Sequence, residues 1–297
     1  MMMTTTTTTT TTNAAPASRA LNAARGTEDL MTRNDPGPEF WTLLHPHTGD
    51  LTGFQPTSRG FSSDVTALVE CEKGRFFVKA VRNRPGGRRD SIIREKLINP
   101  AVCPISPPLR WHAEDDTWLA LGFDRVDGRK SDFAPGSPDL PAIVDTINRI
   151  GELDLPAVAG GWPETRWNRF AADEADASLF EGEALLYTDI NPSNLMIGDE
   201  GTWAVDWSWP THGAAFIDPA CLVVQLISAG QSAECAESWA SGCAAWANAD
   251  PKAIDAFAAA TLRMHRAFAE RKPDASWVRA MAEAARSWAT YRGMSGE

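Results

Sequence analysis

The sequence predicts an α+β fold with two lobes, a small strand-rich N-lobe followed by a mostly helical C-lobe. Short runs of β-branched and aromatic residues, separated by turn residues, occupy the region from about residue 40 to residue 123, and such runs are typical of strands. After about residue 128, apolar residues recur at helical spacing, as in the segment 139–150. We therefore expect the N-lobe to span residues 39–126 and the C-lobe to span residues 127–297.

The first 38 residues are expected to form a disordered tail. Nine consecutive threonines, Thr4–Thr12, make this segment low in complexity, and it lacks the basic start and apolar core of a secretory signal. The sequence contains no apolar run of about eighteen residues, so neither a membrane-spanning helix nor a membrane partner is expected. These observations favour a cytoplasmic protein.

In the N-lobe, the segment Arg75–Val81 predicts a strand that carries a single lysine, Lys79. A lysine within an apolar strand lowers stability unless it has a partner or a function. A strand at Val65–Cys71 is expected to pair with this segment, and a helix is expected at Ser91–Ile98. The alternative is an edge-strand lysine whose ammonium group reaches solvent.

In the C-lobe, two late helices have clear start signals. One is expected to open at Asp250-Pro251 and the other at Asp274, because aspartate is a preferred N-cap and proline a preferred first residue of a helix. Their apolar stripes predict faces directed at the core, and these stripes comprise Ile254, Phe257, Met264 and Phe268 in the first helix and Trp277, Met281 and Trp288 in the second.

The segment Leu185–Ile197 carries the polar residues that phosphoryl transfer requires. Asp189 stands at the end of an apolar run, and Asn194 follows it five residues later. Asp206 stands at the end of a second apolar run. One carboxylate can orient a hydroxyl nucleophile, while an amide and a second carboxylate can hold Mg²⁺ on the phosphates. Taken alone, Asp189 and Asn194 also fit an Asx-rich turn before a hairpin.

Taken in order, these motifs resemble the aminoglycoside phosphotransferase branch of the small-molecule kinases, within the protein-kinase-like superfamily. The resemblance covers about residues 50–230. It implies a protein-kinase-like two-lobed fold in which Asp189 is catalytic and Asn194 and Asp206 are ligands of Mg²⁺. It also implies that Lys79 contacts the α- and β-phosphates and that Glu95 is its partner, with a solvated helical glutamate as the alternative for Glu95.

The resemblance also implies that the protein binds ATP, with GTP as the alternative, and it indicates where this nucleotide is bound. Backbone groups around Phe123 to Val126 would contact the adenine edge, although a plain strand-to-turn segment fits this stretch as well. A phosphate loop would precede the strand at Val65, where backbone N–H groups and serine hydroxyls can cradle phosphates. An ordinary hairpin turn is the alternative for this loop, whose candidate residues are Ser58, Gly60, Ser62 and Ser63.

The sequence departs from the family pattern at three places. Thr188 stands where the family usually has a histidine before the catalytic aspartate, and only Gly60 remains of the glycines in the phosphate loop. Leu222 stands where a second aspartate often follows the Asp218-Pro219 pair, in which Asp218 is interpreted as a structural N-cap. Thr188 and the missing glycines motivate the rival hypothesis of a nucleotide-binding pseudokinase or regulatory module.

The expected acceptor is a hydroxyl group of a small molecule. Only eleven residues separate Asp206 from Asp218, which leaves no room for the activation segment of a protein kinase. By resemblance, the acceptor could be an aminoglycoside or other antibiotic, which would imply a role in resistance, or an amino sugar or choline-like alcohol. The sequence selects none of these acceptors.

The net charge of −11 argues against nucleic-acid binding, which requires a basic surface. An acidic surface would suit a cationic acceptor, although solubility alone also explains this charge. Acids that could meet a cation, or face solvent instead, are Glu234, Glu237 and Asp255. Tryptophans that could stack on an acceptor, or pack in the core instead, are Trp162, Trp167, Trp207 and Trp209. The five cysteines and five histidines have no metal-ligand or disulfide spacing.

Overall fold

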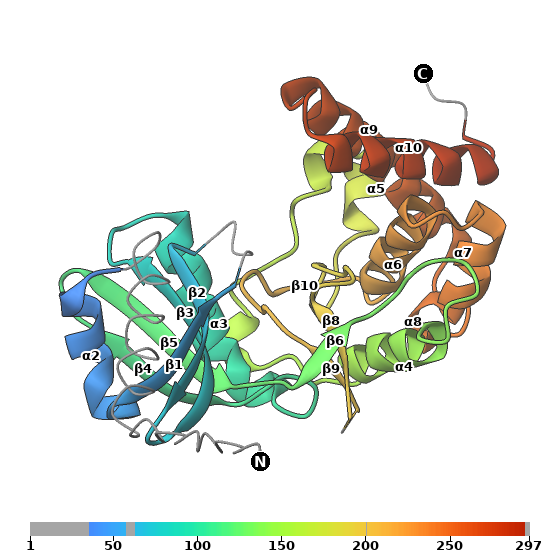
Figure 1. Ribbon diagram of the computed structural model, residues 1–297. Coiled ribbons are helices and arrows are strands. Elements are labelled where there is room, and N and C mark those ends of the chain that lie inside the picture. Colours follow the sequence, from blue (N-terminus) through green and yellow to red (C-terminus); the bar gives the residue numbers. More distant parts are fainter. Residues whose placement is uncertain (1–35, 58–62, 200, 295–297) are drawn as a thin grey trace, which may run out of the picture.

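The computed structural model describes residues 36–57, 63–199 and 201–294. Its N-terminal part is a five-stranded antiparallel sheet, and its C-terminal part is mostly helical (Figure 1). This is the α+β architecture that the sequence predicts. Apart from residues 36–38, the predicted tail of residues 1–38 lies outside the described ranges.

The N-lobe sheet has the strand order β1-β2-β3-β5-β4. Its strands are β1 (Leu51–Pro56), β2 (Val65–Cys71), β3 (Gly74–Arg82), β4 (Leu109–Glu114) and β5 (Trp118–Asp124). The hairpin expected around Lys79 is present, since Val65 of β2 pairs with Ala80 of β3 in antiparallel register. The central position of β3 places Lys79 inside the sheet and not at its edge.

Side-chain alternation along β3 divides the N-lobe into two apolar clusters. Val78 and Ala80 pack with Phe40 and Leu44 of helix α2 (Pro38–Thr48), which the sequence analysis did not foresee. The intervening residues face helix α3 (Gly87–Val102), where Val81 packs with Ile92. Lys79 therefore shares the face of the sheet that α3 covers. This helix is longer than the expected segment 91–98.

The C-lobe contains two small sheets and seven α-helices in the described part of the chain. One sheet pairs β6 (Gly128–Lys130), β8 (Leu195–Gly198) and β9 (Gly201–Ala204), and the other pairs β7 (Ala184–Leu186) with β10 (Thr211–Gly213). The helices are α4 (Leu140–Gly151), α5 (Glu174–Ser178), α6 (Ile217–Ser228), α7 (Ala233–Ala240), α8 (Ala244–Ala247), α9 (Pro251–Arg271) and α10 (Ser276–Tyr291). Two short 3₁₀ turns lie at Ala157–Ala159 and Asn168–Phe170.

The predicted start is correct for one of the two late helices and wrong for the other. Helix α9 begins at Pro251 with the Asp250 carboxylate accepting from the backbone N–H of Lys252, as its start signal predicts. Helix α10 begins at Ser276 after Ala275, so the expected start at Asp274 is wrong. Trp277 is 59% exposed, and its expected place in the core is also wrong. No helix in the described ranges is long and apolar enough to cross a membrane.

Candidate active site

The catalytic loop predicted from the sequence connects β7 to β8. The backbone N–H of Asp189 donates to the Tyr187 carbonyl over 2.8 Å. Two asparagine side chains hold the other side of the loop: Asn194 Nδ2 donates to the Asp189 carbonyl over 3.1 Å, and Asn191 Nδ2 donates to Asp189 Oδ1 over 3.2 Å. Because strand β7 and its partner β10 are packed in the core, this loop begins from a fixed base.

Asp206 follows β9 and lies in the left-handed backbone region, with φ at 63°. A non-glycine residue in this region carries a conformational cost of about 1–3 kcal/mol, and such residues gather at functional sites. Two contacts join this segment to the catalytic loop. The N–H of Val205 donates to the Asn194 carbonyl over 2.8 Å, and the Tyr187 hydroxyl donates to the Val205 carbonyl. The two loops that carry Asp189 and Asp206 are therefore held together.

Lys79 connects the two lobes at this point. Its Nζ lies 2.7 Å from Glu95 Oε2 on α3 and 2.6 Å from Asp206 Oδ1 in the C-lobe. The same Nζ donates to Ser208 Oγ over 2.6 Å. The side chains of Lys79 and Glu95 are 4% and 6% exposed, so this ammonium is almost fully withdrawn from water. The structure thus brings together three residues that the sequence analysis selected from distant segments.

Charge pairing controls the protonation states around Lys79. Burial alone would lower the pKa of Lys79, but the carboxylates of Glu95 and Asp206 outweigh it and raise the pKa above its usual value. Burial would raise the pKa of Asp206, but the neighbouring Lys79 lowers it below its usual value. Burial raises the pKa of Glu95, against the opposing effect of Lys79. Lys79 is therefore a permanent cation within the site.

Asp189 has a different environment. Burial raises the pKa of Asp189, and the nearby Asp206 carboxylate raises it further. Hydrogen bonds from asparagine side chains and the charge of Arg166 oppose this rise. A carboxylate with a raised pKa is a better proton acceptor than an ordinary aspartate, which suits a general base.

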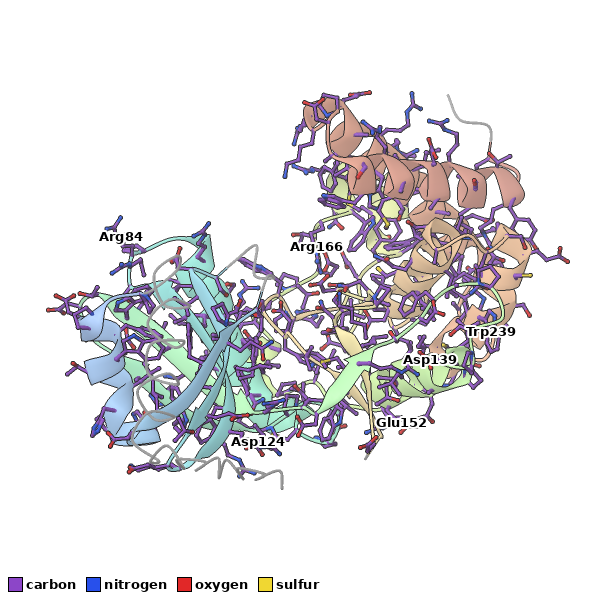
Figure 2. All side chains as sticks on the ribbon, in the orientation of Figure 1. Arg84, Asp124, Asp139, Glu152, Arg166 and Trp239 are labelled. Atoms are coloured by element: carbon purple, nitrogen blue, oxygen red, sulfur yellow. The ribbon has the colours of Figure 1, made fainter. Side chains whose placement is uncertain are left out.

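The contacts of Thr188 show what takes the place of the missing histidine. Thr188 has φ at 60°, and its hydroxyl donates to the Tyr187 carbonyl over 2.8 Å. The same oxygen accepts a hydrogen bond from Arg166 Nη2 over 2.6 Å. Arg166 is in turn held by the buried Glu164, which receives a hydrogen bond over 2.9 Å from Arg166 Nε. Figure 2 shows Arg166 on the side of the C-lobe that faces the N-lobe.

Sequence reasoning missed Arg166, Glu164 and Ser208. Ser208 lies two residues after Asp206, and its hydroxyl contacts both Asp206 and Lys79. Its position only two residues after Asp206 was the one usable signal, because a side chain so close in the sequence can reach the same site. Arg166 and Glu164 lie more than twenty residues before Asp189 in an irregular segment, and nothing in their local pattern indicates the site.

Asp218 has a different role from the predicted one. Helix α6 begins at Ile217, so Phe216 is the residue at the N-cap position and the N-cap prediction for Asp218 is wrong. The Asp218 carboxylate instead accepts hydrogen bonds from the backbone N–H groups of Tyr187, over 2.9 Å, and Thr188, over 2.7 Å. This buried carboxylate therefore fixes the backbone at the start of the catalytic loop.

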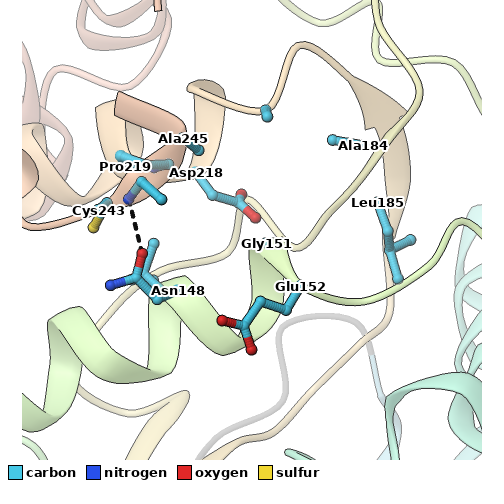
Figure 3. Close-up of a pocket in the computed structure, with 12 residues that line it drawn as sticks. Asn148, Gly151, Glu152, Ala184, Leu185, Asp218, Pro219, Cys243 and Ala245 are labelled. Carbon is cyan, nitrogen blue, oxygen red and sulfur yellow. Dashed lines mark hydrogen bonds between the residues drawn. The ribbon is translucent and has the colours of Figure 1, made fainter. Parts of the chain in front are cut away.

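Asp218 also lines a cavity of about 80 Å³ between α4 and α6 (Figure 3). Asn148, Glu152 and Cys243 contribute to the same cavity. Ligand pockets for small molecules have volumes of about 300–1,000 Å³, so this cavity is too small for a nucleotide or an acceptor.

The contribution of Asp218 to stability is expected to decline as the pH rises. Burial raises the pKa of Asp218 from 3.8 to about 6. Between these values the folded state binds more protons than the unfolded state, so the contribution is complete below about pH 4 and is lost as the pH passes through 6. Melting temperatures from pH 4 to pH 8 for wild type and Asp218→Asn test this prediction. The difference in stability between them should change with pH, and a constant difference would contradict it.

The candidate nucleotide residues are only partly described. Ser58, Gly60 and Ser62 lie outside the described residues. Ser63 lies just before β2, and its buried Oγ has no hydrogen-bond partner within the described residues. Phe123 is 5% exposed and packs in the cluster between the sheet and α3. Its side chain is therefore part of the N-lobe core.

The segment that joins the two lobes includes a backbone donor that is unused within the described residues. The N–H groups of Asp124 and Arg125 donate to the carbonyls of Pro108 and Arg75. In the part of the chain that the structure describes, the N–H of Val126 donates to no acceptor. This position lies within the range 123–126 in which the sequence analysis expects contact with adenine.

Comparison with known proteins shows the fold. No family model and no curated protein sequence matches the chain. Solved structures of small-molecule kinases do match, at low sequence identity. Choline kinase LicA from Streptococcus pneumoniae is 11% identical with a TM-score of 0.56, over 85% of this chain and 98% of that chain.

Two aminoglycoside phosphotransferases match similarly. A variant of aminoglycoside 2′-phosphotransferase-IIIa in its GDP complex is 14% identical with a TM-score of 0.58, over 86% of this chain and 98% of that chain. A thermostable mutant of aminoglycoside phosphotransferase APH(4)-Ia, in a ternary complex with AMP-PNP and hygromycin B, is 13% identical with a TM-score of 0.55, over 83% and 97% of the two chains. The chain therefore has the fold of the aminoglycoside-phosphotransferase-like small-molecule kinases, as its motifs predict.

Proposed function

We propose that this protein transfers the γ-phosphoryl group of a nucleoside triphosphate to a hydroxyl group of a small molecule. The observation that carries this proposal is the convergence of Lys79, Glu95 and Asp206 from both lobes at one point. A lysine buried between two carboxylates has a high desolvation cost, and binding a polyanionic phosphate chain accounts for its retention. The fold supports the same class of function.

At the nucleotide end, Lys79 would bind the α- and β-phosphates while Glu95 keeps its side chain in place. The unused N–H of Val126 is the donor best placed for an adenine or guanine edge. Ser63 offers a buried hydroxyl beside the proposed phosphate loop. ATP and GTP remain alternatives, because a backbone donor does not by itself distinguish the two bases.

At the acceptor end, Asp189 would accept the proton of the attacking hydroxyl. As the hydroxyl oxygen bonds to the γ-phosphorus, the bond to the β-phosphate oxygen breaks and the nucleoside diphosphate leaves. The raised pKa of Asp189 favours its protonated product form. Arg166 and Asp218 keep the loop in position through Thr188 and Tyr187.

The residues present fit a magnesium ion. Asn194 Nδ2 is used by the Asp189 carbonyl, which leaves its amide oxygen for a cation. Asp206 Oδ1 is bound to Lys79 and Ser208, while no hydrogen bond involves Oδ2 within the described residues. Amide and carboxylate oxygens are the ligands that Mg²⁺ prefers. When bound, the ion would neutralise charge on the phosphates during transfer.

A thermal shift experiment with wild type and Asp206→Ala tests the proposal. A ligand that binds only the folded state at about a hundred times its Kd adds about 2.7 kcal/mol of stability, which gives a clear shift for a domain of this size. Wild type should be stabilised by Mg·ATP or Mg·GTP, and Asp206→Ala should lose the Mg²⁺-dependent part of this shift.

The outcomes separate the active enzyme from its rival. If neither nucleotide shifts the melting temperature of the wild type, the kinase proposal is wrong. A shift without any acceptor-dependent release of nucleoside diphosphate, over a broad set of alcohols, would favour the pseudokinase hypothesis. Asp50→Ala is a suitable control, because Asp50 is an exposed aspartate beside His45 in the N-lobe.

A further inference from the structure

The aromatic side chains near the site are already occupied by a cation of the protein itself. The guanidinium of Arg94 lies over the ring of Trp162 at 5.0 Å and over the ring of Trp209 at 5.4 Å, measured from Cζ to the ring centroids. Both tryptophans were candidates for stacking on an acceptor. Rings that hold a guanidinium are poor sites for the ammonium group of an amino sugar or a choline-like alcohol.

The carboxylates near Asp189 are also engaged. Glu164, whose side chain is 1% exposed, is held by Arg166 and accepts from the Thr211 hydroxyl over 2.8 Å. Asp218 accepts two backbone hydrogen bonds from the catalytic loop. Neither carboxylate retains the exposure that binding a cationic ligand requires.

Two of the three acids proposed from the sequence for a cationic acceptor are bound to arginine. Glu237 Oε1 lies 2.7 Å from Arg292 Nη1, and Asp255 Oδ1 lies 2.6 Å from Arg292 Nε. Glu234 is exposed in the first turn of α7, where it complements the helix dipole. Glu237 and Asp255 are therefore not available to a cationic acceptor.

A cation, in contrast, is available beside the catalytic aspartate. Arg166 uses Nε and Nη2 for Glu164 and Thr188. Within the described ranges its Nη1 donates to no acceptor, and its side chain is 43% exposed. Its Nη2 contacts Thr188, the residue immediately before Asp189, over 2.6 Å. Because Glu164 and Thr188 fix the guanidinium plane, Nη1 can bind an anion with little further loss of side-chain entropy.

We propose that the acceptor carries an anionic group, a carboxylate or a phosphate, close to the hydroxyl that is phosphorylated, and that Arg166 Nη1 binds it. This inference rests on the proposed function and names the acceptor class. Guanidinium groups bind carboxylate and phosphate oxygens through short, charge-assisted hydrogen bonds. The same cation repels an ammonium group next to the hydroxyl, so Arg166 selects against amino alcohols as well as for hydroxy acids.

Two matched sets of acceptors test the proposal. The first comprises glucuronate, glucose and glucosamine, and the second comprises 3-hydroxypropanoate, 1,3-propanediol and 3-amino-1-propanol. Acceptor-dependent ADP release with Mg·ATP gives kcat/KM, and melting temperatures with Mg·AMP-PNP report binding. A hydrogen bond between charged groups contributes about 1.5–3 kcal/mol. The kcat/KM of the anionic acceptor in each set should therefore exceed that of the cationic acceptor by about tenfold or more.

The variants must remove the cation without leaving a buried charge unpaired. Arg166→Gln alone would leave Glu164 uncompensated, so the double variant Glu164→Gln/Arg166→Gln is used with it. Both should lose the preference for the anionic acceptor, through KM more than kcat, and Arg166→Lys should restore part of it. Arg169→Gln removes a neighbouring exposed arginine that lies over Phe170, and it should keep the preference.

The outcomes distinguish this inference from the proposed function. Equal responses to all members of both sets, or the absence of any response to the anionic probes, would overturn it. So would a preference for the amines that is weakened by Glu174→Gln or Asp176→Asn, which alter an exposed and a half-buried acid in the first turn of α5. Loss of the Mg·ATP shift in the wild type would contradict the proposed function instead.

Discussion

Replacing Asp189 with asparagine is expected to lower kcat by about 10²–10⁴-fold, because general base catalysis contributes an acceleration of this size. The substitution keeps the shape of the side chain and the contact with Asn191, which approaches Asp189 Oδ1 at 3.2 Å. It removes only the proton acceptor. Nucleotide affinity should change little, because Lys79 and Asp206 are untouched. Steady-state kinetics and the Mg·ATP thermal shift measure the two quantities separately.

The pH dependence provides a control for this prediction. Burial and the nearby Asp206 raise the pKa of Asp189, so the wild-type rate should fall as the pH falls through that raised value and Asp189 becomes protonated. The residual activity of Asp189→Asn should lack this acidic decline. A variant that retains the wild-type rate would show that Asp189 is not the base.

Replacing Lys79 with methionine is expected to destabilise the fold by about 3–5 kcal/mol, since it leaves the buried Glu95 carboxylate without its partner. Both Glu95 and Asp206 lie within 2.7 Å of the ammonium that is removed. Nucleotide binding should also be lost, because Lys79 is the only cation paired with Glu95 and Asp206 among the residues that the structure describes. Chemical denaturation gives the stability, and the Mg·ATP thermal shift gives the binding.

A double variant separates these two effects of Lys79. Lys79→Met/Glu95→Gln removes the cation together with the more deeply buried carboxylate, so it should recover part of the lost stability. It should not recover nucleotide binding. If the single variant were as stable as the wild type, the pairing of Lys79 with two carboxylates would contribute nothing to the free energy of unfolding.

Local patterns were sufficient to predict the N-lobe hairpin and the positions of Lys79, Asp189, Asn194 and Asp206. Each lies in or near a short apolar run that is visible within a few residues of the sequence. The helix α2 was missed, because Pro46 within it and two histidines in its last turn mask a helical pattern. Its formation depends on packing against the sheet through Phe40 and Leu44.

Long-range contacts were the part that sequence reasoning did not reach. The role of Asp218 depends on backbone groups about thirty residues earlier in the chain, and a plausible N-cap position led to the wrong assignment. Thr188 looked like a loss of the usual histidine, yet Arg166 from a separate loop supports it. Trp277 was assigned to the core by spacing alone, although α10 turns that residue to solvent.

The three-way contact of Lys79 has a consequence for the order in which the chain is made. Glu95 follows Lys79 by 16 residues, in the next element of the chain, whereas Asp206 follows it by 127 residues. At ribosomal speeds of about 5–20 residues per second, Asp206 is synthesised about 6–25 seconds after Lys79. During that interval Glu95 can already pair with the lysine, so a newly made N-lobe can close over its buried ammonium before the rest of the site exists.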